Sequence, residues 1–334
     1  MNQAQKSEPI LDLPATAATE SAAKQRERLL QTLQFSLLAL ALVVMPFLVY
    51  PVFLMKVICF AVFTSSVNLL LGQGGLLSFG HAAFFGLAAY TTGYLASHLG
   101  VSVELAFLGG VAASIVLGAV FGAVAVRRLG IYFAMITLAL AQIVYFLAVQ
   151  NPAITRGEDG LQPIPLRALF GIIDLNDTMT LYTLCAVILI VTLMFVHRVT
   201  TSPFGKVLRA IRDNEERART LGYSPRRYKL LAFVITSGIA GVAGSLKALV
   251  MQVVTLGDLH LTTSAEPILM MLVGGIGSLF GPVLGAAVII SAEHFLAPFG
   301  AWVTVLKGVI FIACVLLFKQ GITGLAHKWF ARTK

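Results

Sequence analysis

Long apolar runs, almost free of charged residues, dominate this sequence and restrict the chain to very few folds. Charged residues make up only 12% of it, about half the fraction typical of a soluble domain. A helix needs about 20 apolar residues to cross a lipid core of about 30 Å. Because lipid offers no water to backbone groups, only helices and closed barrels cross it, and these runs lack the alternation of barrel strands. The sequence therefore predicts an all-α polytopic membrane protein.

Ten transmembrane crossings are expected, one for each apolar run. They lie near 31–49, 52–71, 76–97, 103–126, 130–150, 180–197, 229–252, 265–280, 282–298 and 302–319. With their connecting loops they are expected to form a single transmembrane domain over 31–320. The number of crossings is even, so both ends of the chain should lie on the same side of the membrane.

Two glycine-rich segments, 73–86 and 272–286, are poor candidates for full crossings. Each could be a broken or re-entrant helix, which a membrane tolerates only where protein or a cavity shields the backbone. Their sequences are alike, with "LLLGQGGLLSFG" in the first and "MLVGGIGSLFG" in the second. Internal repeats with interrupted helices occur in transporters, but two glycine-rich segments can also be alike by chance. The sequence leaves both interpretations open.

Positive charge is unevenly distributed along the chain. If the chain starts inside, the cytoplasmic segments hold 19 of the 24 lysines and arginines. This is the asymmetry of the positive-inside rule, so the net charge of +9 reports orientation and no nucleic-acid partner. We expect a bacterial inner-membrane protein with both termini in the cytoplasm. A disordered tail over 1–30, which is no cleaved signal, and a short tail over 321–334 complete the domain organisation.

One hydrophilic segment, 198–229, interrupts the apolar runs and carries its own helix signals. The pair at 202–203 is a serine N-cap followed by proline. Asp213 lies three residues before Glu216, as in a capping box, and Gly222 stands where a helix C-terminus favours glycine. The segment is therefore expected to form two short helices before the next crossing.

Apolar residues give these two short helices a packing face. Ala218 and Leu221 share one face of the second helix, because residues three apart are neighbours on a helix. Short helices are marginal when isolated, so the pair must pack on something. The alternative is a solvated basic loop, or one lying on anionic lipid.

Motifs of enzymes and metal sites are missing from the sequence. Cys59, Cys185 and Cys314 each lie in an apolar run, and their spacing fits neither a metal site nor a disulfide framework. The segment "GQGGLLSFG" lacks the Lys-Ser/Thr ending of a phosphate-binding loop. We therefore expect a chain without catalytic residues, bound metal or cofactor.

Four stretches, in matching order, resemble the branched-chain amino acid class of ABC importer permeases, the LivM type. They are "NLLLGQGGLLSFGHAAFFGLAAY", "GEDGLQPIP", "LRAIRDNEERARTLGYSPRRYKLLAFVITSGIAGVAGSL" and "LVGGIGSLFGPVLGA". The likeness extends roughly from Phe35 to Lys319. Four ordered matches are far more specific than any one of them.

The resemblance implies a transport subunit that works by ATP-driven alternating access. In that family the hydrophilic loop docks on a cytoplasmic ATPase. Carried over, the ATPase-coupling residues would be Asp213, Asn214, Glu215, Arg217, Ala218, Leu221 and Gly222. The implied partners are two ATPase subunits that use ATP and Mg²⁺, a second homologous permease, a periplasmic solute-binding protein and membrane lipid.

The translocation path is expected to involve the glycine-rich segments and the few polar residues of the crossings. The candidates are Gly72, Gly74, Gly80, His81, Gln142, Gly274 and Gly277. Glycines there serve either close helix packing or a path wall that exposes backbone to a zwitterion. Lys56 and Lys247 lie near outer helix ends, where their side chains can snorkel to the interface.

Two other functions remain as alternatives. A stand-alone secondary transporter or channel would need coupling carboxylates deep in the membrane. Glu104, Asp258, Glu266 and Glu293 lie near outer ends instead. An ABC permease for urea or short amides is the second alternative, because the sequence does not identify the solute.

Overall fold

The computed structural model describes residues 32–128, 130–168, 171, 174–300 and the isolated positions 305, 308, 309 and 312. The chain divides into two compact units, Met1–Tyr50 and Pro51–Lys334. In the first unit, the described residues form the apolar helix Thr32–Leu48. The expected tails lie outside the described residues, and so does nearly all of the tenth expected crossing, 302–319.

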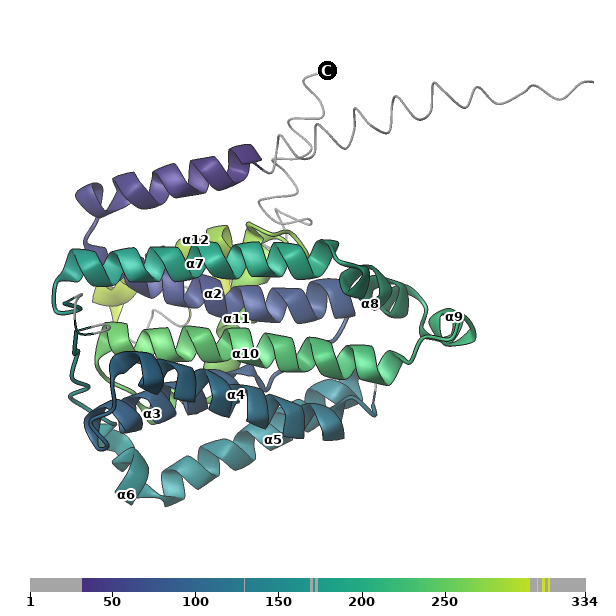
Figure 1. The fold of residues 1–334 in the computed structure, drawn as a ribbon, viewed down its shortest axis with the longest axis horizontal. Coiled ribbons are helices and arrows are strands. Elements are labelled where there is room, and N and C mark those ends of the chain that lie inside the picture. Colours follow the sequence, from purple (N-terminus) through teal and green to yellow (C-terminus); the bar gives the residue numbers. More distant parts are fainter. Residues whose placement is uncertain are drawn as a thin grey trace, which may run out of the picture. The chain divides into compact units, whose positions relative to one another are not determined.

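The described part of the second unit is built from helices (Figure 1). The α-helices are α2 (Pro51–Gly74), α3 (His81–Ser97), α4 (Val103–Ala125), α5 (Ile131–Gln150), α6 (Pro152–Thr155), α7 (Thr178–Thr201), α8 (Pro203–Asp213), α9 (Glu215–Thr220), α10 (Pro225–Met251), α11 (Leu261–Gly274) and α12 (Gly281–Leu296). The 3-10 helices are η1 (Gly157–Asp159), η2 (Leu256–Leu259) and η3 (Ala297–Phe299). These residues include one isolated β-bridge, between Leu161 and Val254, and no strand.

Five of the described helices are long and apolar enough to cross a membrane. They are α2, α4, α5, α7 and α10. The apolar helices Thr32–Leu48, α11 and α12 are shorter. The expectation of an all-α, multi-pass membrane protein is therefore met, whereas the number of ten crossings stays a prediction.

Helix α10 occupies the centre of the second unit and packs against α2, α3 and α4. Figure 1 shows α10 in green alongside α2, with α7 flanking α2. Small residues permit this close packing. A side-chain carbon added at Gly244 would run into the carbonyl oxygen of Phe85 on α3. Lipid tails are as apolar as leucine, so helices in a membrane associate through such close approach and through interhelical hydrogen bonds.

Hydroxyl groups supply those hydrogen bonds around α10. Ser114 of α4 donates to the carbonyl oxygen of Ser237 on α10 over 2.6 Å. Thr92 of α3 donates to the hydroxyl oxygen of Ser245 on α10 over 2.8 Å. All four residues are buried, so these bonds fix the faces that α3 and α4 present to α10.

Both glycine-rich segments are helix breaks. Helix α2 ends at Gly74 and α3 begins at His81, while α11 ends at Gly274 and α12 begins at Gly281. The expected crossings over 76–97 and 265–280 were therefore wrong at these ends, and α11 also begins earlier, at Leu261. Positive φ angles, 65° at Gly75 and 114° at Gly275, explain the breaks, because they favour glycine and end a right-handed helix.

The described residues of the connection between α5 and α7 are attached to neighbouring loops. The connection begins with the short helices α6 and η1. Leu161 then exchanges backbone hydrogen bonds of 2.8 and 3.2 Å with Val254. Arg167 reaches back to the carbonyl oxygen of Gly100 over 2.6 Å. These bonds attach the connection to the loops that follow α10 and α3.

A buried ion pair closes the same end of the helices. The ammonium group of Lys247 lies 2.7 Å from a carboxylate oxygen of Asp258, and only 15% and 12% of the two side chains are exposed. The expectation that Lys247 snorkels outward was therefore wrong, because the loop after α10 brings a carboxylate to it. Lys56, which was also expected to snorkel, lies 3.6 Å from Glu293 and remains partly exposed.

Gly244→Ala should destabilise the purified chain. The added methyl group would meet the Phe85 carbonyl oxygen, where a backbone must shift. Overpacking of this kind costs about 1–3 kcal/mol. We expect a midpoint of thermal aggregation in detergent that is lower by several degrees.

Gly238→Ala is the matched control in the same helix. Its added carbon would lie 3.1 Å from a side-chain carbon of Ile115, which can move. Because alanine favours a helix over glycine by about 1 kcal/mol, this variant should melt at or near the wild-type midpoint. Equal midpoints for both variants would contradict the close packing of α3 on α10.

Candidate functional site

The hydrophilic segment folds into α8 and α9, as its helix signals predict (Figure 1). The Ser202 hydroxyl caps α8 by accepting a hydrogen bond from the Gly205 amide over 3.3 Å, and Pro203 is the first helical residue. Leu208 and Ile211 are buried. Leu208 faces Gly74 at the end of α2. The first short helix therefore packs on the membrane helices and is no solvated loop.

The N-cap of α9 differs from the expectation. Asn214, in an extended conformation, accepts a hydrogen bond from the Arg217 amide over 2.9 Å. Asp213 remains the last residue of α8, and its carboxylate binds the Arg212 guanidinium at 2.9 Å. The predicted capping box of Asp213 and Glu216 was therefore wrong by one residue, because the helix break falls at Asn214.

The C-terminus of α9 confirms the glycine signal. Gly222 has a φ of 86°. Its amide donates to the Arg219 carbonyl oxygen over 3.0 Å, and the Tyr223 amide donates to the Ala218 carbonyl oxygen over 3.2 Å. These two bonds make a Schellman motif, which satisfies the last carbonyl groups of a helix. The chain thus leaves α9 in a fixed direction.

The two apolar residues of α9 have opposite environments. Ala218 is buried, whereas 70% of Leu221 is exposed. The expectation of one shared packed face was therefore wrong, since Leu221 lies at the C-cap and outside the regular helix. Leu221 and Tyr223, two residues apart in the turn after α9, are both exposed on an otherwise charged segment, and they are called the apolar patch below. Arg217 of α9 is also exposed.

An ion pair connects α9 with α10. The Lys229 ammonium lies 2.6 Å from a carboxylate oxygen of Glu215. Only 4% of the Lys229 side chain and 21% of the Glu215 side chain are exposed. A second cation, the Arg219 guanidinium, lies 3.7 Å from Glu215. Removal of one partner from a buried pair costs about 3–5 kcal/mol, because it leaves the other charge buried without compensation.

A hydrogen bond connects α8 with α2. The guanidinium of Arg212 donates to the Gly72 carbonyl oxygen, and its aliphatic part lies over Gly75. Gly72 in turn lies against Gly277, where an added side-chain carbon would stand 2.7 Å from the Gly277 Cα. The hydrophilic segment therefore contacts the first glycine break, which contacts the second.

Asn68 holds the two breaks together. Its amide group donates to the Ser278 carbonyl oxygen over 2.8 Å and accepts from the Gly277 amide over 2.7 Å. Both hydrogen bonds bridge about 210 residues of sequence. Asn68 therefore gives the backbone of the second break the partners that a broken helix needs inside a membrane protein.

The other candidate path residues are distributed over the helices that surround these breaks. A side-chain carbon added at Gly80 would meet the carbonyl oxygen of Thr137 on α5. A side-chain carbon added at Gly274 would meet the carbonyl oxygen of Gly281. Gln142 is half-buried on α5. Close packing thus explains Gly72, Gly80 and Gly274, and a φ of 75° explains Gly277. The role of these glycines in a path stays a prediction.

His81, the remaining candidate, is fully buried at the start of α3. Its ring lies edge-on to Phe84 and Phe233, with centroids 5.6 and 6.0 Å away. Neither ring nitrogen has a hydrogen-bond partner within the described part of the chain. A buried polar group without a partner is uncommon and asks for an explanation, so His81 remains a candidate for contact with water or solute.

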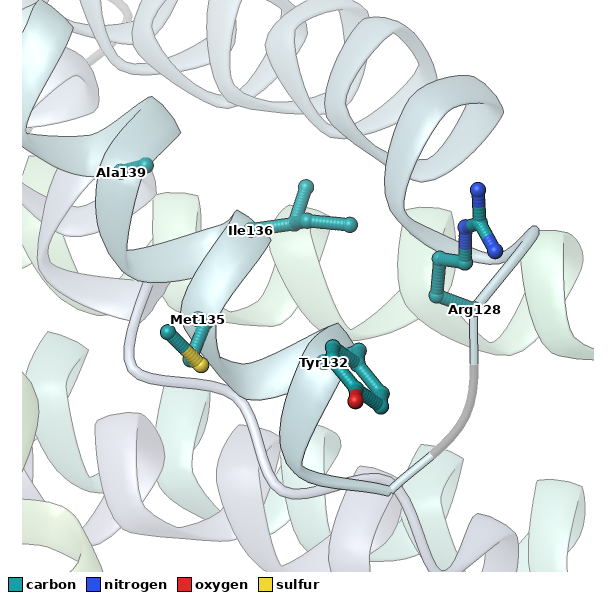
Figure 2. Close-up of a pocket in the computed structure, with 5 residues that line it drawn as sticks. All are labelled: Arg128, Tyr132, Met135, Ile136 and Ala139. Atoms are coloured by element: carbon teal, nitrogen blue, oxygen red, sulfur yellow. The ribbon is translucent and has the colours of Figure 1, made fainter.

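Two hollows open on the surface of the second unit. The one beside α9 has a volume of about 410 Å³ and is lined by Val126, Arg127, Glu215, Arg219, Tyr223, Ser224, Pro225 and Arg226. Figure 2 shows the other, of about 650 Å³, where Arg128 lies across from a mainly apolar stripe of α5. Among the described residues, no cluster of His, Cys, Asp or Glu could hold a metal ion.

Sequence reasoning assigned no role to Asn68, Arg212 or Lys229. Each had a weak signal: Asn68 is an isolated polar residue in an apolar run, and the other two lie in the charged segment. Asn68 binds a backbone amide, Arg212 a backbone carbonyl and Lys229 a carboxylate, and only the folded chain brings these partners near. No motif spacing encodes such contacts.

Asn214→Ala should loosen α9, because the helix loses its N-cap. Such a change costs about 0.5–2 kcal/mol, and the amides of α9 should exchange with deuterium roughly tenfold faster, since 1.4 kcal/mol is a factor of ten. Asn214→Ser should exchange at nearly the wild-type rate. Asp213→Ala is the control for the neighbouring residue, and faster exchange in it than in Asn214→Ala would contradict the assigned cap.

The sequence was compared with known proteins. A family profile described as "Branched-chain amino acid transport system / permease component" matches residues 50–318. The high-affinity branched-chain amino acid transport system permease protein LivM of Escherichia coli is 30% identical over 282 residues, which cover 77% of this chain. The LivM protein of Salmonella typhimurium gives the same identity and coverage.

A probable LivH permease of Methanocaldococcus jannaschii is 30% identical over 139 residues, 39% of this chain and 43% of that protein. The match spans 65% of the length of the Escherichia coli and Salmonella typhimurium relatives. No solved structure matches the chain. On the strength of the match over residues 50–318, the chain belongs to the family of branched-chain amino acid transport system permease components.

Proposed function

We propose that this chain is the membrane-spanning permease subunit of an ABC importer for branched-chain amino acids or related small solutes. The observation that carries the proposal is the capped pair of helices α8 and α9. It is joined to α2 and α10 and presents an exposed apolar patch, Leu221 and Tyr223. The names of the relatives, which are branched-chain amino acid transport permeases, support the solute class.

The proposed mechanism is alternating access driven by another chain. A cytoplasmic ATPase binds α9, and its closure on ATP moves α8 and α9. Arg212 lies against the first glycine break, and Asn68 holds the second break to the first. Movement of the pair would therefore reach the ends of α2, α3, α11 and α12 together.

The wider assembly follows from this role. We propose that the chain crosses a bacterial inner membrane ten times. Both termini, α8 and α9 then lie on the cytoplasmic side. The partners are two ATPases, a second permease and a periplasmic solute-binding protein. The chain needs no nucleotide site of its own, and Gly72, Gly74, Gly80, His81, Gln142, Gly274 and Gly277 remain the proposed path residues.

Reconstitution tests this function. The chain is placed in liposomes with its cognate ATPases, second permease and binding protein, and uptake of labelled leucine is measured with and without ATP. We expect uptake only with ATP and with every partner present. Gradient-driven uptake by the chain alone would overturn the proposal in favour of a stand-alone transporter.

Leu221→Arg should weaken binding of the ATPase. An exposed apolar contact at the centre of an interface contributes about 1–2 kcal/mol or more, so affinity should fall about tenfold or more. The variant should fold normally, because Leu221 is 70% exposed. Leu99→Arg, at the end of α3 remote from α9 in sequence and 62% exposed, is the matched control. Unchanged copurification of the ATPase with Leu221→Arg would contradict the docking patch.

A further inference from the structure

Glu215 borders the surface hollow beside α9, but its carboxylate is occupied by a contact within the chain. Its carboxylate binds the Lys229 ammonium at 2.6 Å, and 21% of its side chain is exposed. The next residue, Glu216, has a side chain that is 79% exposed. Two adjacent glutamates of the same helix thus have different environments, and a carboxylate already bound to a buried ammonium is a poor contact for another protein.

Helix α9 depends on such an internal contact for its position. It has six residues, too few to be stable alone, and Ala218 is its one buried residue. Its partner helix α10 has 27 residues and packs against α2, α3 and α4. Because the ion pair joins residues 14 positions apart, it fixes the angle between a short helix and the central helix.

The second attachment lies at the end of α8, where Arg212 binds the Gly72 carbonyl oxygen of α2. Two polar contacts therefore hold the pair α8–α9, one to α10 and one to α2, in addition to the packing of Leu208 against Gly74. A segment held at two points moves with these helices as one body. Held at one point, it would pivot, and a displacement of α9 would be absorbed in the turn at Asn214.

We propose that Glu215 and Lys229 are positioning residues that transmit the movement of α9 to α10, and that Glu215 makes no contact with the ATPase. This inference rests on the proposed function and refines it. The docking contacts are then left to the exposed side chains of the segment, Leu221, Tyr223 and Arg217. The pair makes α9 a rigid extension of the central helix.

Three variants test the pair: Glu215→Gln, the double variant Glu215→Gln with Lys229→Met, and the matched control Glu216→Gln. The first readout is deuterium exchange of the α9 amides in the purified chain. Glu215→Gln should speed exchange about tenfold, because Lys229 is left buried without a carboxylate. The double variant should exchange more slowly than Glu215→Gln, since no uncompensated charge remains, and Glu216→Gln should match the wild type.

The second readout is the number of leucine molecules imported per ATP hydrolysed in the reconstituted importer. Glu215→Gln should retain the ATPase and its hydrolysis but lower this ratio severalfold, and Lys229→Met should restore part of it. The inference is overturned if Glu215→Gln loses the ATPase while α9 exchanges as in the wild type, or if the double variant is no better than the single one in either readout.

The two proposals fail separately. If the wild-type chain recruits no ATPase, the proposed function is wrong. Deuterium exchange in the purified chain still decides whether Glu215 and Lys229 hold α9. If the wild-type importer works and Glu215→Gln behaves like Glu216→Gln in exchange and in coupling, only the inference about the pair is wrong.

Discussion

Close approach of helices to α10 is the constraint on which the described second unit depends. Lipid provides no hydrophobic force between helices, so contact area and interhelical hydrogen bonds must replace it. Gly244 lets α3 approach with its backbone, and Ser114 and Thr92 bind α10 through their hydroxyl groups. The result is a well-packed centre around which less buried helices such as α5 are arranged.

The two glycine breaks interrupt α2–α3 and α11–α12, and the two interruptions lie against each other, where Gly72 contacts Gly277. Glycine permits the turns at Gly75 and Gly275, but a break leaves backbone groups without helical partners. Asn68 gives hydrogen-bond partners to two such groups, the Gly277 amide and the Ser278 carbonyl, and Arg212 binds the carbonyl oxygen of Gly72. Polar side chains therefore make two broken helices compatible with a buried setting, and they bring the hydrophilic segment into contact with the end of α2.

Sequence reasoning identified the helices and local signals well and the long-range contacts poorly. Apolar runs and capping residues act over a few neighbours, so the helices and the signals at Ser202 and Gly222 were found. The N-cap was placed at Asp213 because Glu216 follows three residues later, as in a capping box. Asn214 is an equally good cap, and the folded chain uses it. The burial of Lys247 depends on Asp258, 11 residues away in η2, and this contact has no local signal.

The α8–α9 segment is attached to α2 and α10, the central helices of the second unit. These two helices are the most buried of those long enough to span a membrane. A displacement of either one therefore changes its contacts with neighbouring helices. A segment attached to a peripheral helix such as α5 would move that helix alone. Because Lys229 and Arg212 direct the contact to the centre instead, a small displacement of α9 must either shift packed helices together or break a buried ion pair.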